Sequence, residues 1–393
     1  MKQITVKRQR AKAIQKGNLW IRMDDILELP QQFSDGEIVQ VVDEKHQFLA
    51  QAYIGKQHKG LAWVYTTKKG VLLDEVFFTR CCEQAYQVRK TIVASLDTNA
   101  YRVFNGAGDG LEGITVDWYN GFASISWYSK GIYHYRQQFI DSFLTVFTDC
   151  LGIYEKIRFE KSDEEISSFM WGKQAPEPLI ICENGVSYAT YMDDGLMTGI
   201  FLDQHHTRKL LKETYASQKT VLNLFSYTGA FSVASAVGGA KETISVDVAN
   251  RSLEKTSEQF RINGIDETTQ KIYVMDVFEY IKYATRKQLK FDVIVVDPPS
   301  FARTKKRTFS VAKDYQSLIQ ELIPLVTENG VLVLSTNAAT ILPKEFDQMI
   351  AKAFENCHRN YTVEQRYGLP KDFKTNGAMP ETDYLKIRFI RVK

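Results

Sequence analysis

One stretch decides the fold of this chain: Thr220-Val-Leu-Asn-Leu-Phe-Ser-Tyr-Thr-Gly-Ala-Phe-Ser232, which leads into Ile244-Ser-Val-Asp247. An apolar run of strand length enters a turn with one glycine, passes into a helix of small residues, and reaches a second apolar run that ends in a carboxylate. This order predicts a β-turn-α-β unit that holds a nucleoside. Gly229 would let the backbone approach a ligand closely, and Asp247 would take both ribose hydroxyls.

The turn Phe225-Ser-Tyr-Thr-Gly229 lacks the further glycines of the Gly-x-Gly-x-x-Gly motif, which make room for a pyrophosphate. A nucleoside without phosphates therefore fits better than a dinucleotide. A nicotinamide oxidoreductase on a similar sheet is the alternative from another enzyme class, and the single turn glycine disfavours it.

The composition is that of an ordinary soluble protein. The chain has 393 residues, of which 44% are hydrophobic and 25% charged, so it is long enough for two or three domains. No apolar run approaches membrane-spanning length, and the N-terminus lacks the apolar core of a signal peptide. We expect a cytoplasmic protein that does not associate with membranes.

The cysteines predict neither disulfides nor zinc. They are odd in number, scattered, and without C-x-x-C spacing, which favours a reducing compartment. The pair His205-His206 has no third ligand at a suitable spacing, so we expect no metal site. The five cysteines are Cys81, Cys82, Cys150, Cys182 and Cys357.

The net charge is only +3, but basic residues gather in two places, the first sixteen residues and a short segment after residue 302. Beside a nucleoside-type turn, two such clusters suggest contacts with the phosphates of a nucleic acid. The residues that we expect to contact RNA are Lys7, Arg8 and Arg10 in the first cluster and Arg303, Lys305, Lys306 and Arg307 in the second.

The pattern of apolar runs and turns predicts three domains. Residues 1–72 contain short strand-like runs separated by turn residues, typical of a compact β-barrel. Residues 73–178 predict an α+β domain, with strands joined by glycine turns and a hairpin at Asn120-Gly121. Residues 179–393 alternate strand and helix, as in a parallel α/β sheet. The helix that opens the second domain would bury Phe77, Cys81, Ala85, Val88 and Ile92.

Three strands of the last domain are expected to end in a carboxylate: Asp247, Asp276 and Asp297. A doubly wound sheet gathers its strand ends along one crevice, so these side chains should lie together. The third runs into Asp297-Pro-Pro-Ser-Phe301. Pro298 and Pro299 fix a rigid, extended loop that can present carbonyls and an aromatic face to a flat base.

These motifs resemble those of the class I S-adenosylmethionine-dependent RNA methyltransferases of the large-subunit ribosomal RNA methyltransferase I/K type. The resemblance spans essentially the whole chain. It implies an N-terminal PUA domain, a central α+β domain and a C-terminal Rossmann-like domain. The motifs that carry it are Thr198-Gly-Ile-Phe-Leu-Asp-Gln-His-His-Thr-Arg208, Asn223-Leu-Phe-Ser-Tyr-Thr-Gly229, Asp247, Asp276-Val-Phe278 and Asp297-Pro-Pro-Ser-Phe301.

The resemblance also implies roles for individual residues toward S-adenosylmethionine. Gln204 and Arg208 would contact the cofactor beside the first strand, and Asp297 would lie near the methyl group and the target base. The loop residues Phe225, Ser226, Tyr227 and Gly229 would hold the methionine end, Asp247 the ribose, and Asp276 with Val277 the adenine. The resemblance implies RNA as the substrate, and within RNA it implies 23S ribosomal RNA or a ribosomal subunit.

One departure from the family bears on the reaction. Methylation of carbon 5 of a pyrimidine requires a cysteine nucleophile, and relatives that use it have a Ser-Cys-Ser type motif after the fifth strand. Here that place reads Leu334-Ser-Thr-Asn337. A purine N7 needs neither nucleophile nor base, so we expect direct transfer, with Asp297, Pro298, Pro299 and Asn337 as the catalytic residues.

Alternatives stay open. Methylation of an exocyclic amine would use Asp-Pro-Pro followed by an aromatic residue, whereas Ser300 stands in that position. A cysteine elsewhere in the chain could serve a cytosine-5 methyltransferase. A non-catalytic RNA-binding protein could retain the fold, although every cofactor-side residue is present. We expect a monomer or a homodimer.

Overall fold

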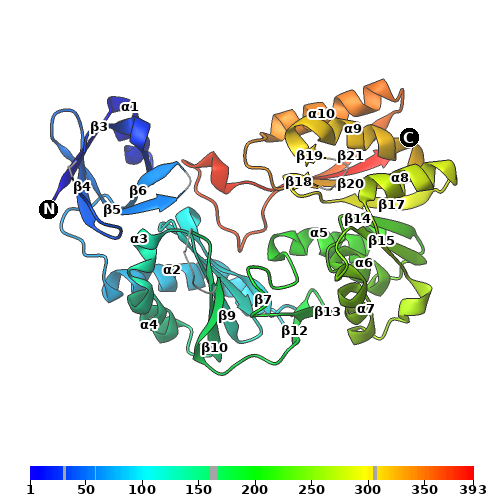
Figure 1. The fold of residues 1–393 in the computed structure, drawn as a ribbon, viewed down its shortest axis with the longest axis horizontal. Helices are drawn as coiled ribbons and strands as arrows, with labels where there is room; N and C mark the ends of the chain where they lie inside the picture. The colour runs from blue at the N-terminus through cyan, green and yellow to red at the C-terminus, as the bar shows by residue number, and fades with distance from the viewer. Residues whose placement is uncertain (30–31, 58, 160–165, 304–307) are drawn as a thin grey trace. The chain divides into compact units, whose positions relative to one another are not determined.

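The computed structural model describes residues 1–29, 32–57, 59–159, 166–303 and 308–393 (Figure 1). The chain divides into two compact units, and neither is one continuous segment. Among the described residues, no helix is both long and apolar enough to cross a membrane. The predicted boundaries at residues 72 and 178 would divide the chain into three domains, and these boundaries stay a prediction. Unit 1 consists of Met1–Ile181, Thr190–Thr198 and Lys371–Thr382, and unit 2 of Cys182–Ala189, Gly199–Pro370 and Asp383–Lys393.

Unit 1 begins with a six-stranded sheet in the order β2-β6-β5-β4-β1-β3. The helix α1 (Arg8–Gln15) packs with Ala11 and Ile14 on the apolar face of this sheet. The sequence pattern did not reveal that the basic N-terminal segment contains a buried strand and a helix. The strands are β1 (Gln3–Val6), β2 (Trp20–Arg22), β3 (Ile26–Glu28), β4 (Ile38–Val42), β5 (Phe48–Gln57) and β6 (Gly60–Thr66).

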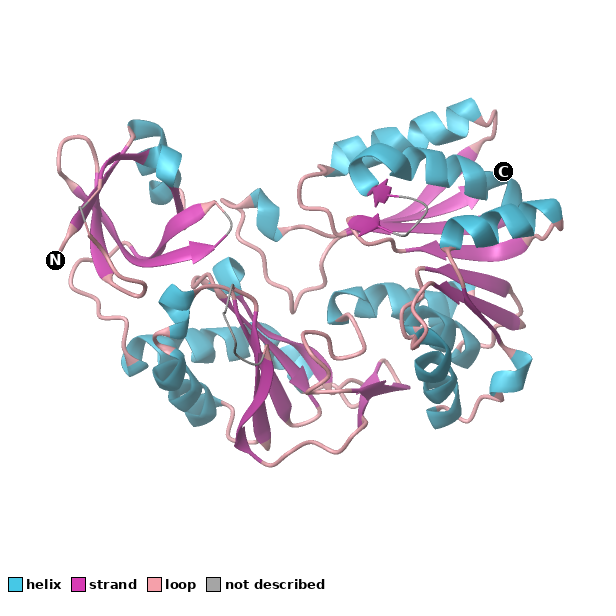
Figure 2. Cartoon of the chain, in the orientation of Figure 1, coloured by secondary structure: helices cyan, strands magenta, loops and turns pink. Residues whose placement is uncertain are grey.

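A five-stranded sheet in the order β11-β10-β9-β8-β7 follows in unit 1. The hairpin predicted at Asn120-Gly121 is confirmed: it joins two antiparallel strands, and the φ angles of its two residues are 47° and 92°. Three helices accompany the sheet, α2 (Glu75–Val93), α3 (Lys130–Tyr133) and α4 (Arg136–Val146) (Figure 2). The strands are β7 (Ala100–Asn105), β8 (Ile114–Tyr119), β9 (Phe122–Trp127), β10 (Gly152–Ile157) and β11 (Ser167–Gly172).

The buried face of α2 differs from the one that the periodicity predicted. Val88 is 43% exposed, whereas Phe78, Cys82 and Arg89 are buried. The guanidinium of Arg89 donates to both carboxylate oxygens of Asp109 (2.6 and 2.7 Å). The periodicity of apolar residues cannot identify a buried arginine. Burial of its charge is tolerable only because the side chain is paired with a carboxylate, which the periodicity does not show.

Unit 2 contains a seven-stranded sheet in the order β16-β15-β14-β17-β20-β22-β21. The first five of these strands are parallel, and β22 runs antiparallel to both its neighbours. The predicted Rossmann-like fold is therefore confirmed. The strands are β14 (Thr220–Leu224), β15 (Glu242–Asp247), β16 (Lys271–Val274), β17 (Phe291–Val296), β20 (Val326–Thr336), β21 (Tyr361–Tyr367) and β22 (Lys386–Val392).

Alternate residues of the central strands pack on opposite faces of this sheet. Leu222 and Ile294 belong to the apolar cluster formed with α8, α9 and α10, whereas Val221 and Val293 belong to a second cluster with Phe231 of α6. Both faces are thus buried, as expected of a parallel sheet. The helices are α5 (His205–Leu210), α6 (Ala230–Val237), α7 (Ser252–Ile262), α8 (Val277–Arg286), α9 (Val311–Leu322) and α10 (Pro343–Asn356).

The strand order reverses between β14 and β17. From β14 the chain moves outward through β15 to β16, and it then returns to the other side of β14 to form β17. In open α/β sheets, ligands bind outside the carboxyl ends of the strands at such a reversal. The loops that begin at Phe225 and Asp297 leave the sheet at this position.

The Arg89–Asp109 pair predicts a large stability effect in unit 1. Arg89→Met would leave the Asp109 carboxylate, whose side chain is 2% exposed, without its main partner, so we expect a loss of about 3–5 kcal/mol of unfolding free energy. Urea denaturation measures it. Arg80→Met, an exposed position of the same helix, is the matched control and should change stability by less than about 0.5 kcal/mol. Equal effects of the two substitutions would contradict the assignment.

Gly229 predicts a second effect, in unit 2. Its φ is 77°, and a Cβ at this position would lie 2.4 Å from Cγ2 of Thr256 in α7. The glycine is therefore needed for packing between helices, and not only for a ligand. Gly264 has a φ of 68° with no atom within 4 Å, so Gly264→Ala should cost about 1–2 kcal/mol from backbone strain alone.

Gly229→Ala adds overpacking of about 1–3 kcal/mol to the same strain. Urea denaturation should therefore give a larger loss for Gly229→Ala than for Gly264→Ala, and Thr256→Ala should recover part of the difference. If Gly229→Ala loses no more unfolding free energy than Gly264→Ala, the packing explanation is wrong.

Candidate active site at the ends of the parallel strands

The loop that follows β14 is held in an uncommon backbone conformation. Phe225, Tyr227 and Gly229 all have positive φ angles, of 58°, 52° and 77°. For the two residues with side chains this conformation costs roughly 1–3 kcal/mol each, and such residues concentrate at functional sites. The N–H of Tyr227 donates to Oδ2 of Asp247 (2.8 Å), and the N–H of Ser226 donates to the carbonyl of Val246 (3.1 Å). The end of β15 therefore fixes the shape of the loop.

Asp247 retains acceptor capacity. Its Oδ1 accepts from the N–H of Ala249 (2.9 Å), and its Oδ2 accepts from the N–H of Tyr227. Each carboxylate oxygen has two lone pairs, so each can accept one further hydrogen bond. Two adjacent acceptors on a partly exposed carboxylate are suited to two neighbouring hydroxyl groups, such as those of a ribose.

Ser226 carries a buried hydroxyl that has no hydrogen-bond partner among the described residues. Its side chain is buried, and the preceding Phe225 packs against Phe278 and Phe309 (ring centroids 6.3 and 6.1 Å apart). Buried hydroxyl groups are normally paired. The unpaired oxygen marks a position at which a polar ligand group would complete the hydrogen bonding.

Asp276 caps a helix. β16 ends at Val274, and the carboxylate oxygen Oδ1 of Asp276 accepts from the N–H groups of Phe278 and Glu279 (2.9 and 3.3 Å) at the start of α8. The expectation that Asp276 ends its strand is therefore wrong by two residues, because the chain turns into the helix first. Oδ2 accepts no hydrogen bond from the described residues. The neighbouring Val277 is buried in the core of unit 2.

Asp297 directly follows β17 and lies in an environment that disfavours its charge. Burial raises the pKa of Asp297 to about 6, and the neighbouring Asp203 adds to the increase. Hydrogen bonds from Ser335 and Gln204 and the positive charge of Arg208 lower the pKa in part. The hydroxyl of Ser335 donates to Oδ1 of Asp297. This carboxyl group therefore changes charge near neutral pH.

Gln204 and Arg208 lie beside this carboxylate but are largely bonded to protein groups. Gln204 donates from Nε2 to the hydroxyl of Ser335 (3.2 Å), and its Oε1 accepts from Thr207 (2.8 Å). The Arg208 guanidinium donates to both oxygens of Glu183 (2.7 and 2.6 Å). Glu183 was missed in the sequence, where nothing distinguishes it from other glutamates, and its buried pair with Arg208 fixes the segment that carries Gln204.

The remaining predicted catalytic residues lie around Asp297. Pro298 is buried and Pro299 exposed. The hydroxyl of Ser300 donates to Oδ1 of Asn337 (2.8 Å), which joins the loop after β17 to the residue that follows β20. The hydroxyl of Tyr315 donates to the carbonyls of Ser335 (2.8 Å) and Val296 (3.3 Å), so the ends of these two strands are held together from α9.

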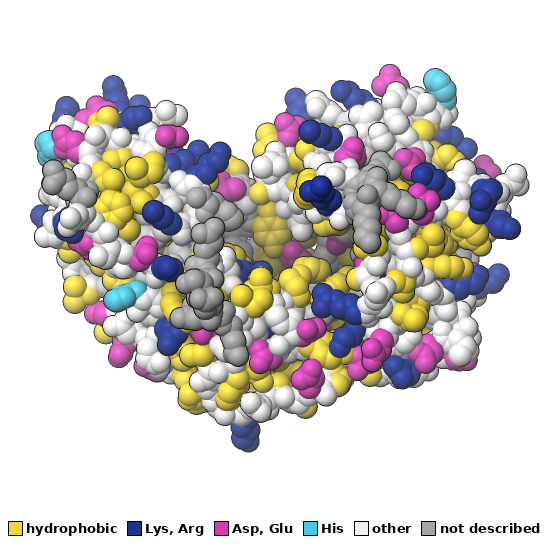
Figure 3. All heavy atoms as spheres, viewed as in Figure 1, with side chains coloured by type: hydrophobic (Ala, Val, Ile, Leu, Met, Phe, Trp, Pro, Cys, Tyr) yellow, Lys and Arg dark blue, Asp and Glu magenta, His cyan; other side chains and the backbone are white. Residues whose placement is uncertain are grey.

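The predicted RNA-binding residues are less uniform than the sequence suggests. Lys7, Arg8 and Arg303 are exposed. Arg10 pairs with Asp25 (2.9 Å) and donates to Asn18, so its charge is engaged within unit 1. On the face shown in Figure 3, Lys and Arg side chains are dispersed among acidic and apolar ones. Three further predicted contacts, Lys305, Lys306 and Arg307, lie outside the described residues.

Comparisons with known proteins agree with this geometry. A family model described as S-adenosylmethionine-dependent methyltransferase matches residues 101–376, and a PUA-like domain model matches residues 4–67. A Bacillus subtilis protein, YwbD, is 46% identical over the full length of both chains and is named provisionally as a ribosomal RNA large subunit methyltransferase. Ribosomal RNA large subunit methyltransferase I of Escherichia coli is 29% identical, with 96% of each chain covered.

Solved structures give the same result. A Streptococcus mutans protein, named provisionally as a SAM-dependent methyltransferase, is 40% identical and superimposes with a TM-score of 0.91 over the whole of both chains. SMU.776, also named provisionally as a methyltransferase and 40% identical over both full lengths with a TM-score of 0.93, was solved as a complex with SAH. With the nucleoside-type loop, the strand order and these relatives in agreement, this chain belongs to the S-adenosylmethionine-dependent methyltransferases.

Proposed function

We propose that the protein transfers a methyl group from S-adenosylmethionine to a base of large-subunit ribosomal RNA, in the cytoplasm. The names of the relatives that match the chain end to end support the substrate, and the PUA-like N-terminal region supports contact with RNA. The observation that best supports methyl transfer is the strained loop 225–229, which Asp247 holds in place where the strand order reverses. Residues 1–72 would dock RNA, and residues 179–393 would carry the reaction.

The residues present fit the cofactor. Asp247 has two oxygens able to accept the ribose hydroxyls, and the free oxygen of Asp276 is suited to the adenine amine. The unpaired hydroxyl of Ser226 lies in the loop assigned to the methionine end, with Phe225, Tyr227 and Gly229. When bound, S-adenosylmethionine supplies a methyl group on a positively charged sulfur.

Asp297 and the groups around it would orient the target base. Ser335, Gln204 and the Arg208–Glu183 pair hold its carboxylate in place before any substrate arrives. Such preorganisation lowers the barrier because no reorientation is required during the reaction. We assign Gln204 and Arg208 chiefly to this positioning, since their polar groups are bonded to protein side chains.

Direct transfer to a purine N7 is the reaction that we favour. Asn337, held by Ser300, lies in the segment Ser335-Thr336-Asn337, where the family resemblance expects the Ser-Cys-Ser type motif of a pyrimidine-C5 enzyme, and this segment contains no cysteine. Burial raises the pKa of Cys81 and of Cys150 to about 12, so these thiols carry little thiolate at neutral pH. In unit 2, Cys357 lies at the end of α10, with its Sγ near the carbonyl of Gln320, and not after β17 or β20.

The pKa of Asp297 predicts how cofactor binding depends on pH. Because its pKa is about 6, the carboxyl group is mostly neutral at pH 5 and ionised at pH 7. An ionised carboxylate attracts the sulfonium of S-adenosylmethionine but not the uncharged sulfur of SAH. Isothermal titration should therefore show the affinity for S-adenosylmethionine rising several-fold, relative to that for SAH, between about pH 5 and 7.

Asp297→Asn is the control for this pH dependence. The amide does not titrate, so the ratio of the two affinities should become independent of pH. Using the ratio cancels any titration of groups that both ligands contact equally. A ratio that keeps its pH dependence in Asp297→Asn would mean that another group is responsible.

The reaction itself can be tested on RNA. Nucleosides of ribosomal RNA from cells with and without the gene are compared by mass spectrometry, and the unmodified RNA is then incubated with the purified protein and labelled S-adenosylmethionine. We expect one methylated purine to disappear and to be restored in vitro. Asp247→Ala should slow restoration at low cofactor concentration by about 10- to 150-fold, because hydrogen bonds to a charged group are worth about 1.5–3 kcal/mol.

Other outcomes separate the alternatives. Loss of 5-methylcytidine would refute the N7 assignment and require a cysteine elsewhere in the chain. Loss of a base methylated on its exocyclic amine would assign Asp297-Pro-Pro-Ser300 to that reaction. If no nucleoside changes, the protein would act as a non-catalytic RNA-binding relative.

A further inference from the structure

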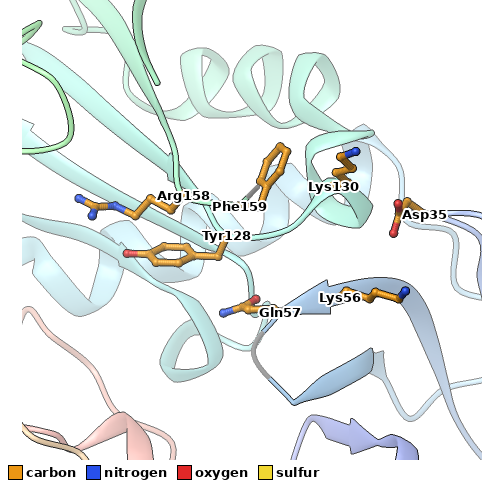
Figure 4. Close-up of a pocket in the computed structure, with 7 residues that line it drawn as sticks. All are labelled: Asp35, Lys56, Gln57, Tyr128, Lys130, Arg158 and Phe159. Carbon is orange, nitrogen blue, oxygen red and sulfur yellow. The ribbon is translucent and has the colours of Figure 1, made fainter. Parts of the chain in front are cut away.

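Unit 1 contains a cavity of about 590 Å³, and none of the described residues that line it is assigned to methyl transfer (Figure 4). It opens between the end of β5, the residues that follow β9, and those that follow β10. None of the residues that line it was singled out in the sequence. The described residues that line it are Asp35, Lys56, Gln57, Tyr128, Lys130, Arg158 and Phe159.

The lining combines positive charge with aromatic rings. Of the seven described side chains, three are cationic and one, Asp35, is acidic. Figure 4 shows Tyr128 and Arg158 at one end and Lys56, Lys130 and Asp35 toward the other, with Gln57 between them. Both lysines are exposed, so neither is held in a buried ion pair.

The aromatic end is held in shape by contacts within unit 1. The guanidinium of Arg158 lies 5.9 Å from the ring of Tyr128 and donates to Ser126 (3.3 Å) and to the carbonyl of Leu196 (2.9 Å). Phe159 packs edge-on against Tyr133, with ring centroids 5.5 Å apart. Because Tyr128 is partly exposed in this frame, a flat ligand can stack on it without rearrangement of the wall.

Gln57 carries a buried acceptor in this cavity. Its side chain is only 9% exposed, and Nε2 donates to Oε1 of Glu112 (2.9 Å). The other Glu112 oxygen accepts from the N–H of Ala107 (2.8 Å), so the carboxylate fixes which way the amide of Gln57 points. Oε1 of Gln57 has no partner among the described residues. Since buried acceptors are normally satisfied, the cavity calls for a ligand with an N–H or O–H donor.

We propose that this cavity binds one unpaired nucleotide of an RNA strand. The base would stack on Tyr128 beside Arg158 and donate from its Watson–Crick edge to Oε1 of Gln57, and Lys56 and Lys130 would contact the flanking phosphates. In a duplex the same donors are already paired and the bases already stacked, so only a single-stranded segment satisfies the site. The proposal rests on RNA being the substrate, and it adds a second contact that selects where the enzyme docks.

The test measures binding of the full-length protein to a fluorescent single-stranded RNA of about ten nucleotides, and to a duplex of the same sequence, by anisotropy at several salt concentrations. Tyr128→Ala should weaken single-strand binding about tenfold and leave duplex binding unchanged. Tyr128→Phe, which retains the ring, should bind like the unaltered protein. Removing both lysines (Lys56→Ala with Lys130→Ala) should reduce the salt slope by roughly 0.7 per phosphate contact.

Lys287→Ala, an exposed lysine of unit 2, is the matched control and should change neither affinity nor slope. Unaltered single-strand binding by a folded Tyr128→Ala, or equal losses for single strand and duplex, would overturn the proposal. Measurements of methyl transfer and of single-strand binding distinguish failure of the cavity proposal from failure of the proposed function. If the protein methylates ribosomal RNA and Tyr128→Ala leaves both KM and single-strand affinity unchanged, only the cavity proposal is wrong. If no methyl transfer occurs but Tyr128→Ala still weakens single-strand binding, only the proposed enzymatic function is wrong.

Discussion

The hydrogen bond from the N–H of Tyr227 to the carboxylate of Asp247 is the constraint on which the rest of the site depends. It ties the loop after β14 to the end of the neighbouring strand, and thereby keeps two residues with side chains in a left-handed backbone conformation. An isolated loop of this sequence would relax to negative φ angles. One carboxylate thus acts as a structural clamp and is also the group that we propose for the ribose, so a substitution at this position would affect both structure and ligand binding.

The two strand-end aspartates illustrate how surroundings assign different properties to one residue type. Asp247 accepts backbone N–H groups and retains exposure, which suits a permanently charged acceptor. Asp297 is also partly exposed, but desolvation of its carboxyl group and the nearby Asp203 raise its pKa to about 6. The difference arises from burial of the Asp297 carboxyl group and from the charge of Asp203, and the hydrogen bond from Ser335 of β20 opposes it. A parallel sheet can therefore present chemically distinct carboxylates at the ends of the two strands that flank β14.

Much of the fold follows from local patterns, since the alternating apolar strands and the Asn120-Gly121 hairpin are encoded in short stretches. Candidate residues at strand ends were predictable for the same reason. What could not be predicted depends on partners distant in sequence: Glu183 opposite Arg208, Asp109 opposite Arg89, and Thr256 against Gly229. Periodicity also placed Val88 on the buried face of α2, because it counts apolar side chains and cannot detect a paired arginine.

The order of strands in unit 2 has a consequence for synthesis on the ribosome. β22 pairs with both β20 and β21, yet it is made after them, and the intervening segment Lys371–Thr382 belongs to unit 1. At about 5–20 residues per second, the open edge of β20 waits roughly 3–10 s for its partner. An unpaired strand edge is a template for association with other chains. The nascent protein therefore passes through an interval of aggregation risk that ends only when residues 386–392 emerge and complete the sheet.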